Sequence, residues 1–184
     1  MNLPNKLTLL RVAMIPIFVI FALFGHTAMQ IIACLIFVAA SFTDYLDGQI
    51  ARKNNLVTDF GKFADPIADK LLVMSAIVVF VGQNRMPSWV CILMLAREFI
   101  ISGFRLVAAG SGKVIAAGQL GKIKTVTQMI TVIAILLFVP VGGAAFAKNF
   151  GTVIANLAMY VATIMTVWSG VDYVVKNFDC IRDM

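Results

Sequence analysis

Six long, mostly apolar stretches occupy most of this 184-residue chain and restrict it to folds that place hydrocarbon around them. Hydrophobic residues make up 61% of the chain and charged residues 13%, with a mean hydropathy of +0.95, far above ordinary soluble domains. A membrane-crossing helix needs about 20 mostly apolar residues. We therefore predict an all-α integral membrane protein with six transmembrane helices in a single domain, residues 1–184. The stretches are roughly 9–24, 29–46, 66–81, 87–107, 123–140 and 151–174.

Lysine and arginine are unevenly distributed between the loops, and this predicts the orientation of the chain. If the N-terminus faces the cytoplasm, that side carries nearly all loop cations, whereas the opposite loops hold only Arg85 and Lys148. We therefore expect both termini in the cytoplasm. The formal charge of +6 would also draw this face toward anionic lipids, although topology signalling alone explains such a bias. We interpret residues 5–8 as a short interfacial segment, with Asn5 or Thr8 as an alternative helix cap.

Two pairs of aspartates, four of the nine acidic residues, stand within 26 positions, where two apolar stretches meet the predicted cytoplasmic boundary. Asp44 and Asp47 are three residues apart, and Asp65 and Asp69 are four apart, so each pair shares one face of a helix. Unpaired carboxylates at a membrane boundary repel one another and are costly. Mg²⁺ and Mn²⁺ prefer carboxylate oxygens as ligands. The spacing therefore predicts a divalent-cation site between two helices.

Small residues beside these carboxylates leave room for a ligand, because Gly48 lies beside the first pair and Gly61 precedes the second. The second helix can start near Thr58 or at Asp65, and both starts keep the second pair on one face. Two ions about 3.5 to 4 Å apart could clamp the attacking and leaving oxygens of a displacement at phosphorus. The alternative is a solvated charge band in which the aspartates pair with Arg52, Lys53, Lys62 and Lys70.

Charged residues also interrupt the fourth apolar stretch, in the sequence LAREFIISGFR. Arg97 and Glu98 need a partner or a function there, because charges inside a membrane are costly. Arg105 lies eight residues after Arg97, close to the same helical face. With Lys122 and Lys124, the two arginines can form an anion pocket beside the metal site. The alternatives are that Arg97 and Glu98 pair with neighbouring helices and that the lysines only signal topology.

The residues around the aspartates resemble the signature of a known family. DYLDGQIAR, eight further residues and GKFADPIAD match the pattern DxxDGxxAR(x8)GxxxDxxxD of the CDP-alcohol phosphotransferases. The segments PNKLTLLR, AREFIISGFR and GQLGKIKT are similar to bacterial members acting on sn-glycerol 3-phosphate, so the resemblance covers essentially the whole chain. The eight fixed positions all match, at Asp44, Asp47, Gly48, Ala51, Arg52, Gly61, Asp65 and Asp69.

This resemblance implies a role for the matching residues. Two divalent ions, Mg²⁺ or Mn²⁺, would be held by the four aspartates, and Asp69 would also serve as the general base. From the anion-pocket argument above, and not from the signature, we expect the phosphate of the acceptor at Arg97, Arg105, Lys122 and Lys124. The nucleotide and diphosphate of CDP-diacylglycerol would be bound by Asn5, Thr8, Gly48, Arg52 and Thr58.

The reaction implied is transfer of the phosphatidyl group from CDP-diacylglycerol to sn-glycerol 3-phosphate, releasing CMP. Inositol phosphate, phosphatidylglycerol or serine are alternative acceptors for the same donor and metals. The resemblance also implies a homodimer in a bacterial plasma membrane, in contact with membrane lipids and with its active site facing the cytoplasm. No nucleic-acid partner is expected.

A cation transporter is the rival interpretation from another class. It predicts acidic groups near the middle of the membrane along a continuous path. Here the acidic cluster lies at one boundary and the outer half offers no second acidic site, so the sequence favours the enzyme.

Overall fold

The computed structural model describes residues 3–53, 59–110, 118–141 and 150–177, without the side chains of residues 3–7, 44–53, 59–66, 69 and 109. Within these ranges the chain forms six helices, which confirms the all-helical prediction and the number of helices. Each predicted apolar stretch corresponds to one of them. The helices are α1 (Leu3–Leu23), α2 (Thr27–Lys53), α3 (Asp59–Gly82), α4 (Ser88–Gly110), α5 (Gln119–Phe138) and α6 (Phe150–Lys176).

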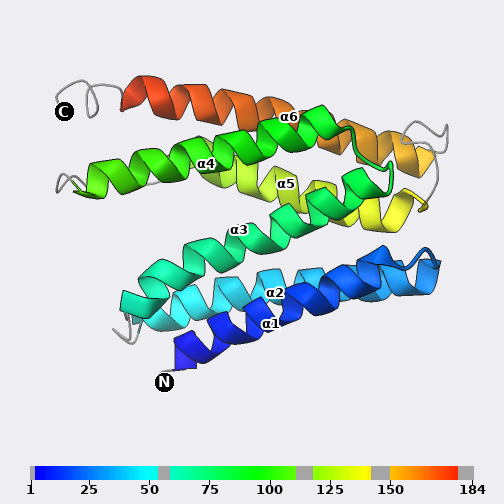
Figure 1. Cartoon of the computed structure of the whole chain (residues 1–184), viewed down its shortest axis with the longest axis horizontal. Coiled ribbons are helices and arrows are strands. Elements are labelled where there is room, and N and C mark those ends of the chain that lie inside the picture. The colour runs from blue at the N-terminus through cyan, green and yellow to red at the C-terminus, as the bar shows by residue number, and fades with distance from the viewer. Residues whose placement is uncertain (1–2, 54–58, 111–117, 142–149, 178–184) are drawn as a thin grey trace.

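Successive helices run in opposite directions along the bundle (Figure 1). α1 packs against α2 and α3, while α6 packs against α5 and α4, and α3 lies between these two groups. The first turns of α1, α3 and α5 therefore lie at the same end as the last turns of α2, α4 and α6, on the left of Figure 1. In each described helix, the predicted site residues lie either in the half nearer this left-hand end of the bundle or close to the middle of the helix.

At this end the helices continue beyond the apolar stretches. α2 runs past Leu46 to Lys53, and α3 begins at Asp59 instead of Pro66. The difference arises because hydropathy detects the apolar part of a helix, whereas the backbone hydrogen bonds continue into polar sequence. The earlier of the two predicted starts of α3 is therefore confirmed. The segment of residues 5–8 is likewise part of α1 and does not form a separate element.

At the opposite end, a tight turn joins α3 to α4. Asn84 has a φ of 56°, in the left-handed region that asparagine tolerates better than most residues. The Arg85 backbone N–H donates to the Phe80 carbonyl at 2.8 Å, which satisfies a carbonyl at the end of α3. The turn thus ends one helix and directs the Arg85 side chain inward.

The Arg85 side chain is fully buried and joins several helices. Its guanidinium donates to the Gln30 Oε1 atom on α2 at 2.7 Å, to the Gln83 Oε1 atom at 3.1 Å and to the Ile135 carbonyl on α5. Gln30 in turn donates to the Ala22 carbonyl on α1 at 2.9 Å. Burial lowers the pKa of Arg85 to about 10, so the side chain stays protonated at neutral pH.

Small residues allow α5 and α6 to approach closely. A Cβ atom on Gly151 would lie 2.9 Å from the Phe138 ring, so a larger residue there would have to displace that ring. Ala155 and Ala162 are fully buried further along α6. Close approach over small side chains is typical of helix pairs in membranes, where packing replaces the hydrophobic effect as the driving force.

The outside of the bundle is covered by large apolar side chains. Leu35 on α2, Phe99 on α4 and Trp168 on α6 are 64%, 73% and 62% exposed, and every helix contributes similar residues. Soluble monomers rarely expose apolar patches this extensive. By length and composition α5 and α6 can each cross a membrane, and within the described residues α1, α2 and α3 contain shorter apolar helical parts. These features suggest membrane association, while six spans and cytoplasmic termini stay predictions.

Candidate functional site

The four signature aspartates lie on two helices that pack together at one end of the bundle. Asp44 and Asp47 belong to the last turns of α2, and Asp65 and Asp69 belong to the first turns of α3. Each pair therefore shares a helical face, as the spacing predicts. Their side chains lie outside the described part, so their role as metal ligands stays a prediction. Among the described side chains, no three His, Cys, Asp or Glu residues form a group that could hold a metal ion.

The residues predicted to bind the donor nucleotide are placed at the same end. α1 carries Asn5 and Thr8 in its first turns, and α2 carries Gly48 and Arg52 in its last turns. Thr58 lies outside the described residues. The alternative of a helix cap at Asn5 or Thr8 is wrong, because both residues lie inside a helix that begins at Leu3.

The buried face of α1 is directed at the other signature-bearing helices. Thr8 is only 1% exposed and Arg11 is completely buried, one turn further along. α1 packs against α2 and α3, the two helices that carry the aspartates. The sequence analysis assigned Arg11 no role in the site, and its burial shows that this cation faces the interior of the bundle.

The four residues predicted to bind the phosphate of the acceptor substrate fall into two pairs in the structure. Arg97 on α4 and Lys124 on α5 meet at Glu98 inside the bundle, and Lys124 is 2% exposed. Arg105 and Lys122 are exposed side chains nearer the ends of the same helices. The buried pair is therefore the better candidate for close contact with an anion.

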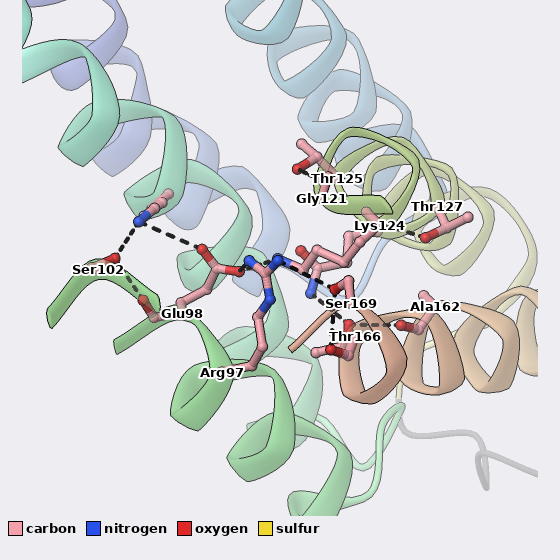
Figure 2. A network of polar contacts seen from close by, with 12 residues as sticks. Arg97, Glu98, Ser102, Gly121, Lys124, Thr125, Thr127, Ala162, Thr166 and Ser169 are labelled. Carbon is pink, nitrogen blue, oxygen red and sulfur yellow. Dashed lines mark hydrogen bonds and ion pairs between the residues drawn. The ribbon is translucent and has the colours of Figure 1, made fainter. Parts of the chain in front are cut away.

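Glu98 is the shared partner of three cations, Lys70, Arg97 and Lys124, and we call these four residues the Glu98 cluster (Figure 2). The Arg97 Nη1 atom donates to the Glu98 Oε1 atom at 3.0 Å, and the Lys124 ammonium donates to the same oxygen. The Lys70 Nζ atom lies 3.7 Å from the Glu98 Oε2 atom and also donates to the Ser102 hydroxyl. The cluster thus links α3, α4 and α5.

Two glycines make space for the Arg97 side chain between α5 and α6. A Cβ atom on Gly170 would lie 3.1 Å from the Arg97 Cγ atom, and one on Gly121 would lie 3.6 Å from its Nη2 atom. The Nη2 atom donates to the Ser169 hydroxyl on α6 at 3.2 Å (Figure 2). The Arg97 Nε atom is buried without a hydrogen-bond partner among the described residues. Steric contact and hydrogen bonds therefore both fix this guanidinium.

Hydroxyl groups around the cluster each donate to a carbonyl on their own helix, which leaves their oxygens able to accept. The Ser102 hydroxyl donates to the Glu98 carbonyl at 2.6 Å, and the Ser169 hydroxyl donates to the Thr166 carbonyl at 3.2 Å. These oxygens then accept from Lys70 and Arg97. The direction of every hydrogen bond is consistent, as expected of an ordered polar network.

The Glu98 cluster contains three cations and one carboxylate, so positive charges exceed negative charges by two. Charges inside a bundle are screened less than at a surface, and an uncompensated excess attracts an anion. Ammonium and guanidinium groups are also the usual donors to phosphate oxygens. The arrangement can therefore bind a phosphate dianion.

Comparison with known proteins gives the family. The sequence profile of the CDP-alcohol phosphatidyltransferases matches residues 1–168. The chain belongs to this family. It is 44% identical to "CDP-diacylglycerol--glycerol-3-phosphate 3-phosphatidyltransferase" of Bacillus subtilis over an alignment of 194 positions, gaps included. The alignment covers 98% of this chain and 97% of that protein.

Other CDP-alcohol phosphatidyltransferases show similar coverage. A Rickettsia felis protein with the same name is 37% identical over 172 residues, or 94% of this chain and 93% of its own length. A "Probable phosphatidylglycerophosphate synthase" of Mycobacterium tuberculosis is 41% identical over 179 residues, or 95% of this chain and 81% of its own length. The resemblance inferred from the signature is thus confirmed over nearly the whole chain.

Members of this family generally depend on divalent metals. The donor set agrees with that chemistry, because four carboxylates on two packed helix ends offer the oxygen ligands that hard cations prefer. No other acidic residue lies in the signature segment except Asp59, which falls outside its fixed positions.

Three features of the site were not predicted from the sequence. These are the central place of Glu98, the contribution of Lys70 from α3 and the two glycines beside Arg97. A signal existed for Glu98, since a lone carboxylate inside an apolar stretch needs a cation nearby. Which cations it would meet depends on how α3, α4 and α5 rotate against one another, and no local pattern reports that.

Proposed function

We propose that this protein transfers the phosphatidyl group of CDP-diacylglycerol to sn-glycerol 3-phosphate, giving phosphatidylglycerophosphate and CMP. The observation that carries the proposal is the complete family signature on α2 and α3, in a chain whose relatives over nearly their full length bear this name. The excess of positive charge at the Glu98 cluster supports a phosphorylated acceptor over serine.

Asp44, Asp47, Asp65 and Asp69 are proposed to hold two divalent ions, Mg²⁺ or Mn²⁺. When bound, the ions would neutralise charge on the diphosphate and on the departing phosphate. Four carboxylates at one helix junction otherwise repel one another, so an ion-binding role also explains why they stand together.

Asp69 is proposed to accept the proton of the 1-hydroxyl group of glycerol 3-phosphate. The acceptor oxygen then forms a bond to the lipid-side phosphorus, while the bond from that phosphorus to the CMP oxygen breaks and CMP departs. No side chain becomes covalently attached. The protein contributes mainly by positioning two substrates and by stabilising charge, as in other phosphoryl transfers.

The donor is proposed to lie where α1 and α2 meet the aspartates, with its nucleotide and diphosphate held by Asn5, Thr8, Gly48, Arg52 and Thr58. Thr8 is buried on the face of α1 that packs toward α2 and α3, which supports this location. The acyl chains of the donor would remain in the surrounding bilayer, beside the apolar exterior of the helices.

The acceptor's phosphate is proposed to bind Arg97 and Lys124, with Arg105 and Lys122 as weaker, solvent-screened contributors. Burial of Lys124 and the fixed position of Arg97 support the distinction. Exposed charges interact more weakly because water and salt screen them.

The whole chain, residues 1–184, is proposed to form one domain with six spans in a bacterial plasma membrane, as a homodimer. Both termini and the active site would face the cytoplasm. The uneven distribution of basic residues supports this orientation. In this orientation the active site would open to the cytoplasm, where the soluble glycerol phosphate and CMP exchange.

A reconstitution assay tests the function. Purified protein is incubated with CDP-diacylglycerol, Mg²⁺ or Mn²⁺ and one acceptor at a time: glycerol 3-phosphate, inositol phosphate, phosphatidylglycerol or serine. CMP release and the lipid product are measured together. We expect turnover with glycerol 3-phosphate. Turnover with serine and not with glycerol 3-phosphate would contradict the proposal.

A further inference from the structure

We propose that Glu98 is a positioning residue for the acceptor, holding Arg97 and Lys124 where they meet its phosphate and tying them through Lys70 to the helix that carries Asp69. This inference rests on the proposed function and deepens it. Glu98 and Lys70 lie outside the fixed positions of the family signature.

The first argument is the arrangement of contacts. One oxygen of Glu98 accepts from both Arg97 and Lys124, so a single carboxylate sets the separation of two cations from different helices. The Glu98 side chain is 9% exposed and that of Lys124 is 3% exposed, so water competes little for these hydrogen bonds. Loss of the carboxylate would remove the shared acceptor that links the two cations.

The second argument is charge. If the cluster served only to stabilise the fold, we would expect charges to balance, because a buried excess is costly. Among the described side chains, the buried Arg97 and Lys124 share one carboxylate and the partly exposed Lys70 adds a third cation, so positive charges exceed negative charges by two. A phosphate monoester carries close to two negative charges at neutral pH. The phosphate of the bound acceptor, together with the Glu98 carboxylate, would therefore neutralise the three cations of the cluster.

The third argument is the connection to α3. Lys70 donates to Ser102 and lies 3.7 Å from Glu98, so α4 holds α3 at the residue next to Asp69. The proposed base and the phosphate-binding cations thus belong to one connected set of contacts. A shift of Glu98 would change both the affinity for the acceptor and its placement relative to α3.

Replacement of Glu98 by glutamine tests the proposal, because Glu98→Gln removes the charge and keeps the shape. The KM values for glycerol 3-phosphate and CDP-diacylglycerol are measured on the purified, full-length protein. We expect the acceptor KM to rise about tenfold or more, with the donor KM changed by no more than about twofold. An unchanged acceptor KM, or an equal rise in both values, would overturn the proposal.

Asp172→Asn is the matched control, because it also converts an acid to its amide in an ion pair at the same end of the bundle. Asp172 pairs with Lys176 at 2.7 Å, one turn further along α6, and the Lys176 side chain is 68% exposed. We expect both KM values within about twofold of wild type, since exposed pairs contribute little.

A double-mutant cycle separates positioning from general stabilisation. Glu98→Gln and Lys124→Met are made singly and together, and the acceptor KM is measured for all four proteins. If Glu98 acts through Lys124, its substitution should have a much smaller effect once Lys124 is absent. Multiplicative effects of the two substitutions would overturn the proposal.

Two further measurements keep the outcome clear. If Glu98→Gln does not fold, judged by its thermal midpoint, Glu98→Asp carries the same test, because it keeps the charge but shortens the side chain. Wild-type turnover with each acceptor is measured first and tests the proposed function separately. If the wild-type enzyme turns over another phosphorylated acceptor, the KM values are compared with that acceptor. If the enzyme turns over only an unphosphorylated acceptor, the positioning proposal fails as well.

Discussion

Gly170 on α6 lies directly against the side chain of Arg97 on α4: a Cβ atom on Gly170 would be 3.1 Å from the Arg97 Cγ atom. The glycine is therefore needed for space and not for a turn, since it lies inside a regular helix. Arg97 is held from the other direction by Glu98 and Ser169. The site thus includes residues without functional side chains whose role is to leave room for a cation.

Gly170→Ala should weaken use of the acceptor without changing any charge. The added methyl group would displace Arg97 by a few tenths of an ångström. We expect kcat/KM for glycerol 3-phosphate to fall by about three- to tenfold, because small displacements of positioning groups reduce rates strongly. Gly103→Ala on α4 is the control, since nothing lies within 4 Å of its Cβ position. Equal effects of the two substitutions would contradict the steric argument.

Asp69→Asn should abolish transfer while leaving the fold intact. Asparagine cannot accept the proton of the acceptor hydroxyl and is a poorer ligand for a divalent cation. A general base alone contributes about 100- to 10,000-fold, so CMP release should fall by at least that factor. The thermal midpoint in detergent, measured without metal, should stay close to wild type. Substantial residual turnover would exclude Asp69 as the essential base.

Burial distinguishes the two lysines at the start of α5. Lys124→Met should raise the KM for glycerol 3-phosphate by about tenfold or more, because a buried, charge-assisted donor is lost. Lys122→Met should raise it by only about twofold, since that side chain is exposed and screened. Steady-state kinetics on the two purified variants checks the order. The reverse order would show that the acceptor binds at the surface.

The sequence predicted the six helices and the aspartate pairs because both depend on local periodicity. Hydropathy marks an apolar helix wherever it packs, and residues three or four apart share a face in any helix. Hydropathy alone does not mark the extensions to Lys53 and back to Asp59, because they are polar, and the sequence offered the start near Thr58 only as one of two alternatives. Their hydrogen bonds continue where the hydropathy signal stops.

The Glu98 cluster could be predicted only in part, because it depends on contacts between helices. The sequence left open whether Arg97 binds an anion or whether Arg97 and Glu98 pair with neighbouring helices. Arg97 does pair with Glu98, and yet the cluster as a whole retains excess positive charge. The two alternatives are therefore compatible. The packing of α3 and α5 on α4 places Lys70 and Lys124 beside Glu98, and this excess of cations cannot be predicted from the sequence of α4 alone.

Removal of divalent metal should stop the reaction and lower stability together. With excess EDTA we expect no CMP release, and addition of Mg²⁺ or Mn²⁺ should restore it. A ligand at about 100 times its dissociation constant stabilises the folded state by about 2.7 kcal/mol, so the thermal midpoint should rise with metal. In Asp44→Asn this rise should be smaller. Full activity in EDTA would contradict a metal role for the aspartates.

Arg85 provides a test at the opposite end of the bundle, where stability and catalysis should separate. Arg85→Lys keeps the charge, but lysine cannot reproduce the guanidinium's hydrogen bonds to Gln30, Gln83 and the Ile135 carbonyl. Loss of these hydrogen bonds, with the buried Gln30 Oε1 atom losing its donor, should cost about 2 kcal/mol and lower the thermal midpoint by about 5 °C. The KM values for both substrates, measured well below that midpoint, should stay at wild-type levels, because the signature aspartates lie at the other end of α2 and α3. A selective change in either KM would mean that the two ends of the bundle are coupled through these helices.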